Sequence, residues 1–267
     1  DRRLGRIIRM MFYVPMEPVL INKLIEDESY IHQIKWDGIR AICYITDKES
    51  TLKTKNNNDV TSKYPELCSI ITKNFKSKSA VLDGEIVSLD EDGKPSFHSI
   101  MKRHMLKSCS KINYYAEKSP AYYILFDIIF LDGKDLRQLP YCERKSLLEK
   151  TYENDIHSAV TEDFSDSVSL FQLMKEKKME GIVSKNLNSP YVSGKKHSYW
   201  FKTKIRKKMF AVIGGIKLNN RIPASLLLGV YNDKDLYFIG NASSGLKQTD
   251  LYALKDHLDC LKSEKSP

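Results

Sequence analysis

The sequence predicts an α+β protein in which antiparallel sheets with flanking helices are followed by a smaller, incomplete β-barrel. Three observations support this fold class. Short apolar or alternating segments end at glycine, asparagine and proline, as strands do. Segments with helical spacing lie between them, and after Lys204 the pattern changes to short strands at regular intervals. We therefore expect two domains, residues 11–204 and a truncated second domain of residues 205–267.

The elements of the first domain follow from apolar spacing and turn residues. Strands are expected within residues 31–46, divided near Gly38, and over residues 81–89, 121–131, 180–185 and 199–204. Helices are expected over residues 64–73, where Pro65 takes an N-terminal position, and over residues 141–151 and 168–177. The arginine-rich residues 1–10 are set aside as an extension that precedes the fold.

The second domain begins at a basic hinge, residues 205–208. Strands are expected over residues 209–216, 224–231 and 236–239, followed by a helix from residue 250. This spacing is typical of a small barrel of the OB type. The segment is shorter than a five-stranded barrel requires, so we expect the barrel to be incomplete.

Composition points to a polyanionic partner and away from membranes. Lys and Arg number 43 against 34 Asp and Glu, which gives a net charge of +9. The five cysteines form no Cys-x-x-Cys pair and are typical of reduced thiols in the cytoplasm. The longest apolar run, residues 122–131, is far below the ~20 residues that span a bilayer. We expect a cytoplasmic protein with no membrane partner.

Lys35 is the first candidate for chemistry, because it lies in Lys35-Trp36-Asp37-Gly38 at the end of an expected strand. If this segment is extended, Lys35 and Asp37 project the same way and Trp36 packs behind them. A lysine attacks only when neutral, and removing its proton at neutral pH costs about 4 kcal/mol unless its surroundings help. Asp37 alone would oppose deprotonation, so further cations are expected near Lys35.

Lys202 and Lys204 could supply that positive charge. Alternation along residues 200–204 puts Trp200, Lys202 and Lys204 on one face, where two ammonium groups could clamp a phosphate. The alternative is a solvated edge strand whose lysines prevent aggregation.

Two glutamates beside glycines are candidate metal ligands. Glu85 ends Leu-Asp-Gly-Glu, and Glu180 begins Glu-Gly-Ile-Val-Ser-Lys. Carboxylates on separate strands around one cleft suit Mg²⁺ or Mn²⁺ that also touches phosphate oxygens. The alternative is that each glutamate only flanks a turn.

Together the motifs resemble the adenylation domain, a nucleotidyltransferase fold with ATP-grasp-like character, of ATP-dependent DNA ligases of the small bacterial or phage type. The resemblance covers residues 16–204 and continues more weakly into the OB-like segment. It rests on five motifs in one order: Lys-x-Asp-Gly-x-Arg (35–40), Leu-Asp-Gly-Glu (82–85), Phe-Asp (126–127), Glu-Gly-Ile-Val-x-Lys (180–185) and Trp-x-Lys-x-Lys (200–204).

The resemblance implies a reaction in three steps. Lys35 would attack the α-phosphate of ATP and carry AMP, which would pass to the 5′-phosphate of a nick in duplex DNA. The 3′-hydroxyl would then seal the strand. The resemblance implies a monomer that is encoded by a bacterium or a phage and uses ATP and Mg²⁺ or Mn²⁺. Its implied role is in DNA repair, replication or recombination.

The resemblance also implies roles for site residues. Lys35, Asp37, Lys202 and Lys204 would be catalytic, and Glu85 and Glu180 would assist the metal. Gln33 takes the place of the family's glutamate, and Lys55 that of an arginine that binds phosphate. The nucleotide-binding set comprises Gln33, Arg40, Lys55, Glu85, Phe126, Glu180, Lys185, Lys202 and Lys204, with Phe126 stacked on adenine.

Two alternatives stay open within this interpretation. An RNA ligase or a capping-type guanylyltransferase shares the lysine nucleophile. No Arg-x-Asp-Lys-like motif follows Ile205, although ligases of this type use one to orient pyrophosphate. Self-adenylation would then be impaired, and the chain could be a catalytically weak, ligase-like protein that binds nicks.

Overall fold

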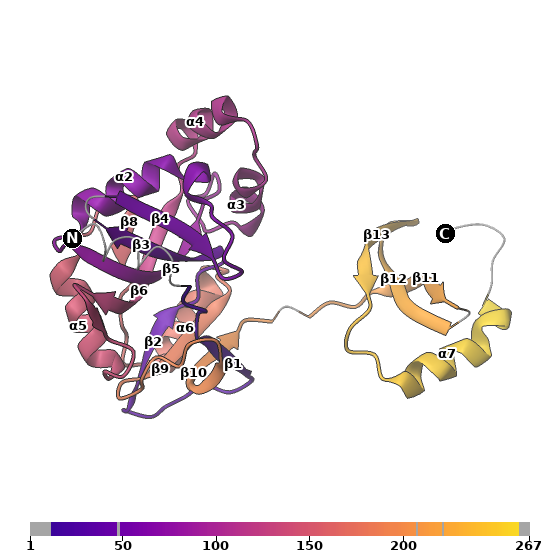
Figure 1. Cartoon of the computed structure of the whole chain (residues 1–267). Helices are drawn as coiled ribbons and strands as arrows, with labels where there is room; N and C mark the ends of the chain where they lie inside the picture. The colour runs from indigo at the N-terminus through magenta and orange to yellow at the C-terminus, as the bar shows by residue number, and fades with distance from the viewer. Residues whose placement is uncertain (1–11, 47–48, 207, 221, 262–267) are drawn as a thin grey trace. The chain divides into compact units, whose positions relative to one another are not determined.

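The computed structural model describes residues 12–46, 49–206, 208–220 and 222–261. The chain divides into two compact units, residues 1–205 and residues 206–267 (Figure 1). Among the described residues, none of the helices combines the length and the apolar character that a membrane crossing requires.

The larger sheet of the first unit has six strands. Its order is β4-β3-β5-β6-β7, and β8 pairs with β6 in parallel while the other pairs are antiparallel. The strands are β3 (Ile39–Thr46), β4 (Glu49–Thr54), β5 (Ser79–Val87), β6 (Tyr122–Leu131), β7 (Lys134–Asp135) and β8 (Ser158–Val160).

Both faces of the larger sheet are buried, as β3 illustrates. Ala41, Cys43 and Ile45 belong to one hydrophobic cluster, whereas Ile42 and Tyr44 belong to another. Successive side chains of a strand point to opposite faces, so the two clusters lie on opposite sides of the sheet. A strand of this kind is apolar throughout, which explains the continuous apolar runs in the sequence.

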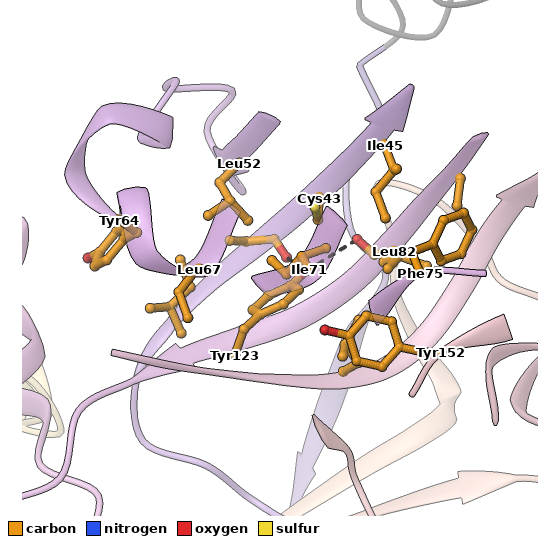
Figure 2. Close-up of a cluster of buried hydrophobic side chains, with 14 of the residues drawn as sticks. Cys43, Ile45, Leu52, Tyr64, Leu67, Ile71, Phe75, Leu82, Tyr123 and Tyr152 are labelled. Atoms are coloured by element: carbon orange, nitrogen blue, oxygen red, sulfur yellow. Dashed lines mark hydrogen bonds between the residues drawn. The ribbon is translucent and has the colours of Figure 1, made fainter. Parts of the chain in front are cut away.

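Helices α2 (Pro65–Asn74) and α5 (Tyr141–Thr151) pack against the larger sheet. Leu67 and Ile71 of α2 pack in the first cluster with Leu82 and Tyr123 of the sheet (Figure 2). The Tyr123 hydroxyl, deep in this cluster, donates a hydrogen bond to the carbonyl of Ala41 at 2.9 Å. The buried hydroxyl of Tyr123 therefore has a hydrogen-bond partner.

A buried ion pair fastens α5 to the sheet. Nε and Nη2 of Arg144 donate to the two carboxylate oxygens of Asp127 at 2.8 and 2.9 Å, and both side chains are fully buried. Removing one partner of such a pair leaves an uncompensated buried charge. The aspartate beside Phe126 is thus bound to α5.

A second sheet of four strands has the order β1-β10-β9-β2. Its strands are β1 (Glu17–Ile21), β2 (Tyr30–Ile34), β9 (Gly181–Asn186) and β10 (Lys196–Lys204). Helix α6 (Ser167–Glu176) covers it with Leu170 and Met174, and the Asp166 carboxylate caps the helix N-terminus. Trp200 of β10 packs in the second cluster of the larger sheet, so it joins the two sheets.

The first unit has three further short helices: η1 (Thr61–Lys63), α3 (Phe97–His104) and α4 (Cys109–Lys118). Arg103 lies only 2% exposed between them. Its guanidinium donates to Glu66 Oε1 at 2.5 Å and to the carbonyls of Ser119 and Lys63 at 3.1 Å. Arg103 is therefore bound to buried acceptors and contributes nothing to a basic surface.

The second unit contains the three-stranded antiparallel sheet β11-β12-β13 and helix α7 (Gln248–Leu261), which packs against β12. The strands are β11 (Val212–Asn219), β12 (Ile222–Asn232) and β13 (Asp235–Ala242), so the three expected strands are confirmed. The barrel is not: over the described residues this sheet stays open, because β11 and β13 each pair only with β12.

Candidate active site

A cavity of about 290 Å³ in the first unit is lined by both sheets. The walls include Gln33 of β2, Glu85 of β5 and Lys202 of β10. Eight of the residues predicted for the site line it: Gln33, Lys35, Arg40, Lys55, Glu85, Phe126, Lys185 and Lys202. Asp37, Glu180 and Lys204 are not among its lining residues.

The loop that carries Lys35 connects β2 to β3, which confirms the expected division of residues 31–46. The backbone N–H of Lys35 donates to the carbonyl of Gly181 at 2.9 Å. A Cβ atom on Gly38 would lie 2.2 Å from the carbonyl oxygen of Ile86, so only glycine lets the loop pass this close to β5. Lys35 and Trp36 both line the cavity.

Glu180 bridges two lysines beside the cavity. Its Oε2 accepts from Lys35 Nζ at 2.5 Å, and its Oε1 lies 2.7 Å from Lys204 Nζ. Burial raises the pKa of Glu180, but hydrogen bonds from the two ammonium groups outweigh it and hold the pKa below its usual value. Glu180 is therefore an ionised acceptor for the Lys35 amine, and both its oxygens are occupied by ammonium groups.

The backbone at Gly181 makes this bridge possible. Gly181 has φ of +145°, and a Cβ atom there would lie 2.1 Å from the carbonyl oxygen of Thr203 in β10. The absence of a side chain lets the two strands approach closely at the residue after Glu180.

Lys202 and Asp37 complete the charges around Lys35. Burial and the charges of Lys35 and Lys204 lower the pKa of Lys202, so these cations lie within electrostatic reach of one another. Burial and the charge of Glu180 raise the pKa of Asp37. The further cations that the sequence requires near Lys35 are thus present.

Lys185 is buried in a cage of three aromatic rings. Its Nζ lies 4.6 Å from the Phe126 ring centroid, 4.7 Å from that of Tyr141 and 4.3 Å from that of Trp200. Nζ also donates to the Phe126 carbonyl at 2.9 Å. Burial lowers the pKa of Lys185 to about 7, so a phosphate nearby would favour the charged form.

Asp83 positions the guanidinium of Arg40 through two hydrogen bonds. Its Nε and Nη2 donate to the two Asp83 oxygens at 2.9 and 2.6 Å, and the Tyr191 hydroxyl donates to the same carboxylate at 2.5 Å. The guanidinium lies 5.0 Å from the Phe126 ring centroid. Both Arg40 and Phe126 line the cavity, so the ring and the cation form one wall.

Glu85 is the carboxyl group that could hold a metal. Burial raises its pKa to about 7, and over the described residues it has no hydrogen bond or ion pair. No cluster of three or more His, Cys, Asp or Glu side chains in that part of the chain could enclose a metal ion. Magnesium is often bound by one or two carboxylates together with substrate phosphates, and Glu85 fits that arrangement.

Lys55 and Gln33 lie at different depths. Lys55 is exposed and pairs with Glu17 at 3.5 Å. Gln33 is 3% exposed, and its Nε2 donates to the Tyr141 hydroxyl at 2.7 Å and to Asp163 Oδ1 at 2.6 Å. Sequence reasoning missed Asp83, Tyr141 and Asp163 as supporting residues. Asp83 lies within the motif Leu-Asp-Gly-Glu but was given no role, and Tyr141 and Asp163 belong to none of the five motifs.

Comparison with known proteins places these features in context. Residues 15–204 match the family described as ATP dependent DNA ligase domain. The SPbeta prophage-derived DNA ligase-like protein LigB of Bacillus subtilis is 31% identical over 261 residues, which are 96% of this chain and 87% of that protein. The multifunctional non-homologous end joining protein LigD of Mycolicibacterium smegmatis is 30% identical over 237 residues, 87% of this chain but 29% of LigD.

A solved structure agrees with this match. A mycobacterial DNA ligase D complexed with ATP and MES has a TM-score of 0.63 and 27% sequence identity, over 96% of this chain and 80% of that one.

Proposed function

Because this chain belongs to the ATP-dependent DNA ligase family, we propose that it seals nicks between 5′-phosphate and 3′-hydroxyl ends of duplex DNA through AMP carried on Lys35. The observation that carries the proposal is the environment of Lys35. Its amine is bound by ionised Glu180 and lies on a cavity that Lys185, Lys202 and Arg40 line with positive charge. Such a site suits a reaction at a phosphate.

In the first step, Lys35 Nζ forms a bond to the α-phosphorus of ATP as the bond to pyrophosphate breaks. Glu180, 2.5 Å away, is positioned to take the proton that Nζ loses. Lys202 and Lys204 stabilise negative charge on the phosphate. We assign catalytic roles to Lys35, Lys202 and Lys204, and an electrostatic role to Asp37.

The nucleotide would occupy the cavity, with Phe126 against the base and Arg40, Lys55 and Lys185 toward the sugar and phosphates. Glu85 and the phosphate oxygens would hold Mg²⁺ or Mn²⁺, which neutralises phosphate charge when bound. Glu180 would act on the metal only after releasing an ammonium group.

At the level of domains, we infer that residues 11–204 are the adenylation domain and residues 205–267 an incomplete OB-type domain. The net charge of +9 supports nicked duplex DNA as partner. A monomer acting in DNA repair, replication or recombination, encoded by a bacterium or phage, is our proposal for its context.

Labelled ATP and Mg²⁺ test the first step. The protein should acquire label that survives a denaturing gel, and Lys35→Ala should abolish it, because Lys35 carries the amine that both lines the cavity and is bound by Glu180. Lys175→Ala, an exposed lysine of α6, is the matched control and should keep the label. Label that persists in Lys35→Ala would contradict the assignment.

Nicked substrates decide the remaining steps. A nicked duplex with a preformed 5′-adenylate should be sealed without ATP, and DNA ends should be joined faster than ribonucleotide ends. Faster joining of RNA would favour the RNA ligase or capping-type alternative. Nick binding without any Lys35-dependent label would favour the catalytically weak binding protein.

A further inference from the structure

Gln33 lies at the cavity with its amide orientation determined by its neighbours. Nε2 has two hydrogens, and both are used: one on the Tyr141 hydroxyl at 2.7 Å and one on Asp163 Oδ1 at 2.6 Å. An ionised carboxylate only accepts hydrogen bonds, so the nitrogen end must face Asp163. The carbonyl Oε1 is then the atom that Gln33 offers to the cavity that it lines.

Tyr141 reinforces this orientation. Its hydroxyl lies 3.3 and 3.4 Å from the two oxygens of Asp163 and donates its single hydrogen there. Its lone pairs are left to accept from Gln33. Burial and the charge of Asp163 raise the pKa of Tyr141 well above its ordinary value, so the group remains a hydroxyl.

Asp163 is itself positioned by α5. Lys145 Nζ lies 3.2 Å from Asp163 Oδ1 and donates to the carbonyl of Thr161 at 2.5 Å. Lys145 and Tyr141 are four residues apart on α5 and therefore share one helix face. The helix thus holds both the carboxylate and the hydroxyl that orient Gln33.

We propose that Asp163, positioned by Lys145 and Tyr141, makes the site select adenine over guanine nucleotides by presenting the Gln33 carbonyl to the base. This inference rests on the proposed function, in which the base enters the cavity. Adenine has an amino group at C6 that donates to a carbonyl, whereas guanine has an oxygen there that repels it. Asp163 is a positioning residue, because it acts on the base through Gln33.

Without Asp163 the amide can turn over. A glutamine presents either its oxygen or its nitrogen, and only the oxygen matches adenine. In the protein as it stands, turning the amide would break two hydrogen bonds and place its carbonyl against the Asp163 carboxylate. We expect discrimination between ATP and GTP on the order of 100-fold, since the wrong base leaves buried polar groups unpaired.

Lys35-dependent labelling with ATP and with GTP, each over a range of concentrations, measures the discrimination. Asp163→Ala should reduce the ratio of kcat/KM values for ATP and GTP by about tenfold or more, mainly through KM. Purine riboside triphosphate, which lacks the amino group, should be a poor substrate for the wild type and should approach ATP in the variant. Thermal unfolding confirms that each variant is folded.

A charge exchange separates orientation from mere structural support. Gln33→Glu alone brings two carboxylates together and should weaken labelling by ATP. In the double variant Gln33→Glu with Asp163→Asn, the asparagine amide can donate to a glutamate that only accepts, so preference for ATP should return. A purely structural Asp163 predicts no such rescue.

Three results would overturn the inference: equal use of ATP and GTP by the wild type, an unchanged ratio in folded Asp163→Ala, or no rescue in the double variant. Calorimetric binding of ATP and GTP to the same proteins measures selectivity without chemistry. If the wild type binds ATP in preference to GTP and Asp163→Ala does not, yet no Lys35 adduct forms, the proposed function fails and the selectivity stands.

Discussion

Glu85 is a single carboxyl group whose charge state makes stability depend on pH. Burial raises its pKa to about 7, whereas the pKa of an exposed glutamate, as in the unfolded chain, is about 4.3. Between these values the folded state binds a proton that the unfolded state has lost, so the free energy of unfolding falls as pH rises. The contribution is complete below pH ~4 and is lost above pH ~7.

Glu85→Gln tests this effect because a neutral amide does not titrate. At pH 8 the variant should have a larger free energy of unfolding than the wild type by about 1–3 kcal/mol, discounted for partial exposure. At pH 5 the difference should be smaller. Urea unfolding at both pH values measures it, and equal differences would contradict a pKa near 7.

At the scale of elements, the approach of β9 to β10 depends on Gly181. Gly181→Ala should lower the free energy of unfolding by about 3 kcal/mol or more, because a Cβ would meet the Thr203 carbonyl at 2.1 Å in a strained conformation. It should also reduce labelling of Lys35, whose N–H is bound by Gly181.

Gly133→Ala is the matched control. Gly133 also has a positive φ, +88°, but nothing lies within 4 Å of an added Cβ. Its cost should be about 1 kcal/mol, from backbone conformation alone. Similar losses in the two variants, measured by urea unfolding, would show that strand contact at Gly181 contributes little.

Prediction of elements from sequence succeeded where apolar spacing was strong. The helices expected over residues 64–73, 141–151 and 168–177 are confirmed as α2, α5 and α6 within one residue. Strands β1, β4, β7 and β8 were missed. The partners of β1 and β8 lie far away in the sequence, so local spacing does not indicate their pairing. Helix α4 had no counterpart among the helices expected from the sequence.

At the scale of the whole molecule, the net charge of +9 predicts salt-dependent binding to nicked DNA. Affinity should fall by about 10³-fold between 50 and 200 mM salt if about six phosphates are contacted, because each contact releases counterions. Fluorescence anisotropy with a labelled nicked duplex measures the slope. A flat response would exclude a surface that follows the DNA backbone.

Some residues of the candidate site could be predicted from local sequence motifs, whereas others depend on contacts between distant segments. The order of the motifs along the chain is enough to select Lys35, Lys202, Lys204 and both glutamates as candidates. It does not identify Asp163, which is 130 residues from Gln33 and has no motif around it. Nor does it predict that Glu180 binds both Lys35 and Lys204.

The sequence by itself determined the α+β class, most helices and strands of the first unit, and the residue types available for phosphate chemistry. These depend on the spacing of neighbouring residues, which a linear chain displays directly. Only the tertiary structure decided that the Glu180 carboxylate accepts a hydrogen bond from the Lys35 amine and that Arg103 is buried. It also decided that β11, β12 and β13 form an open sheet. These outcomes depend on which distant segments pack together, and local spacing does not specify that.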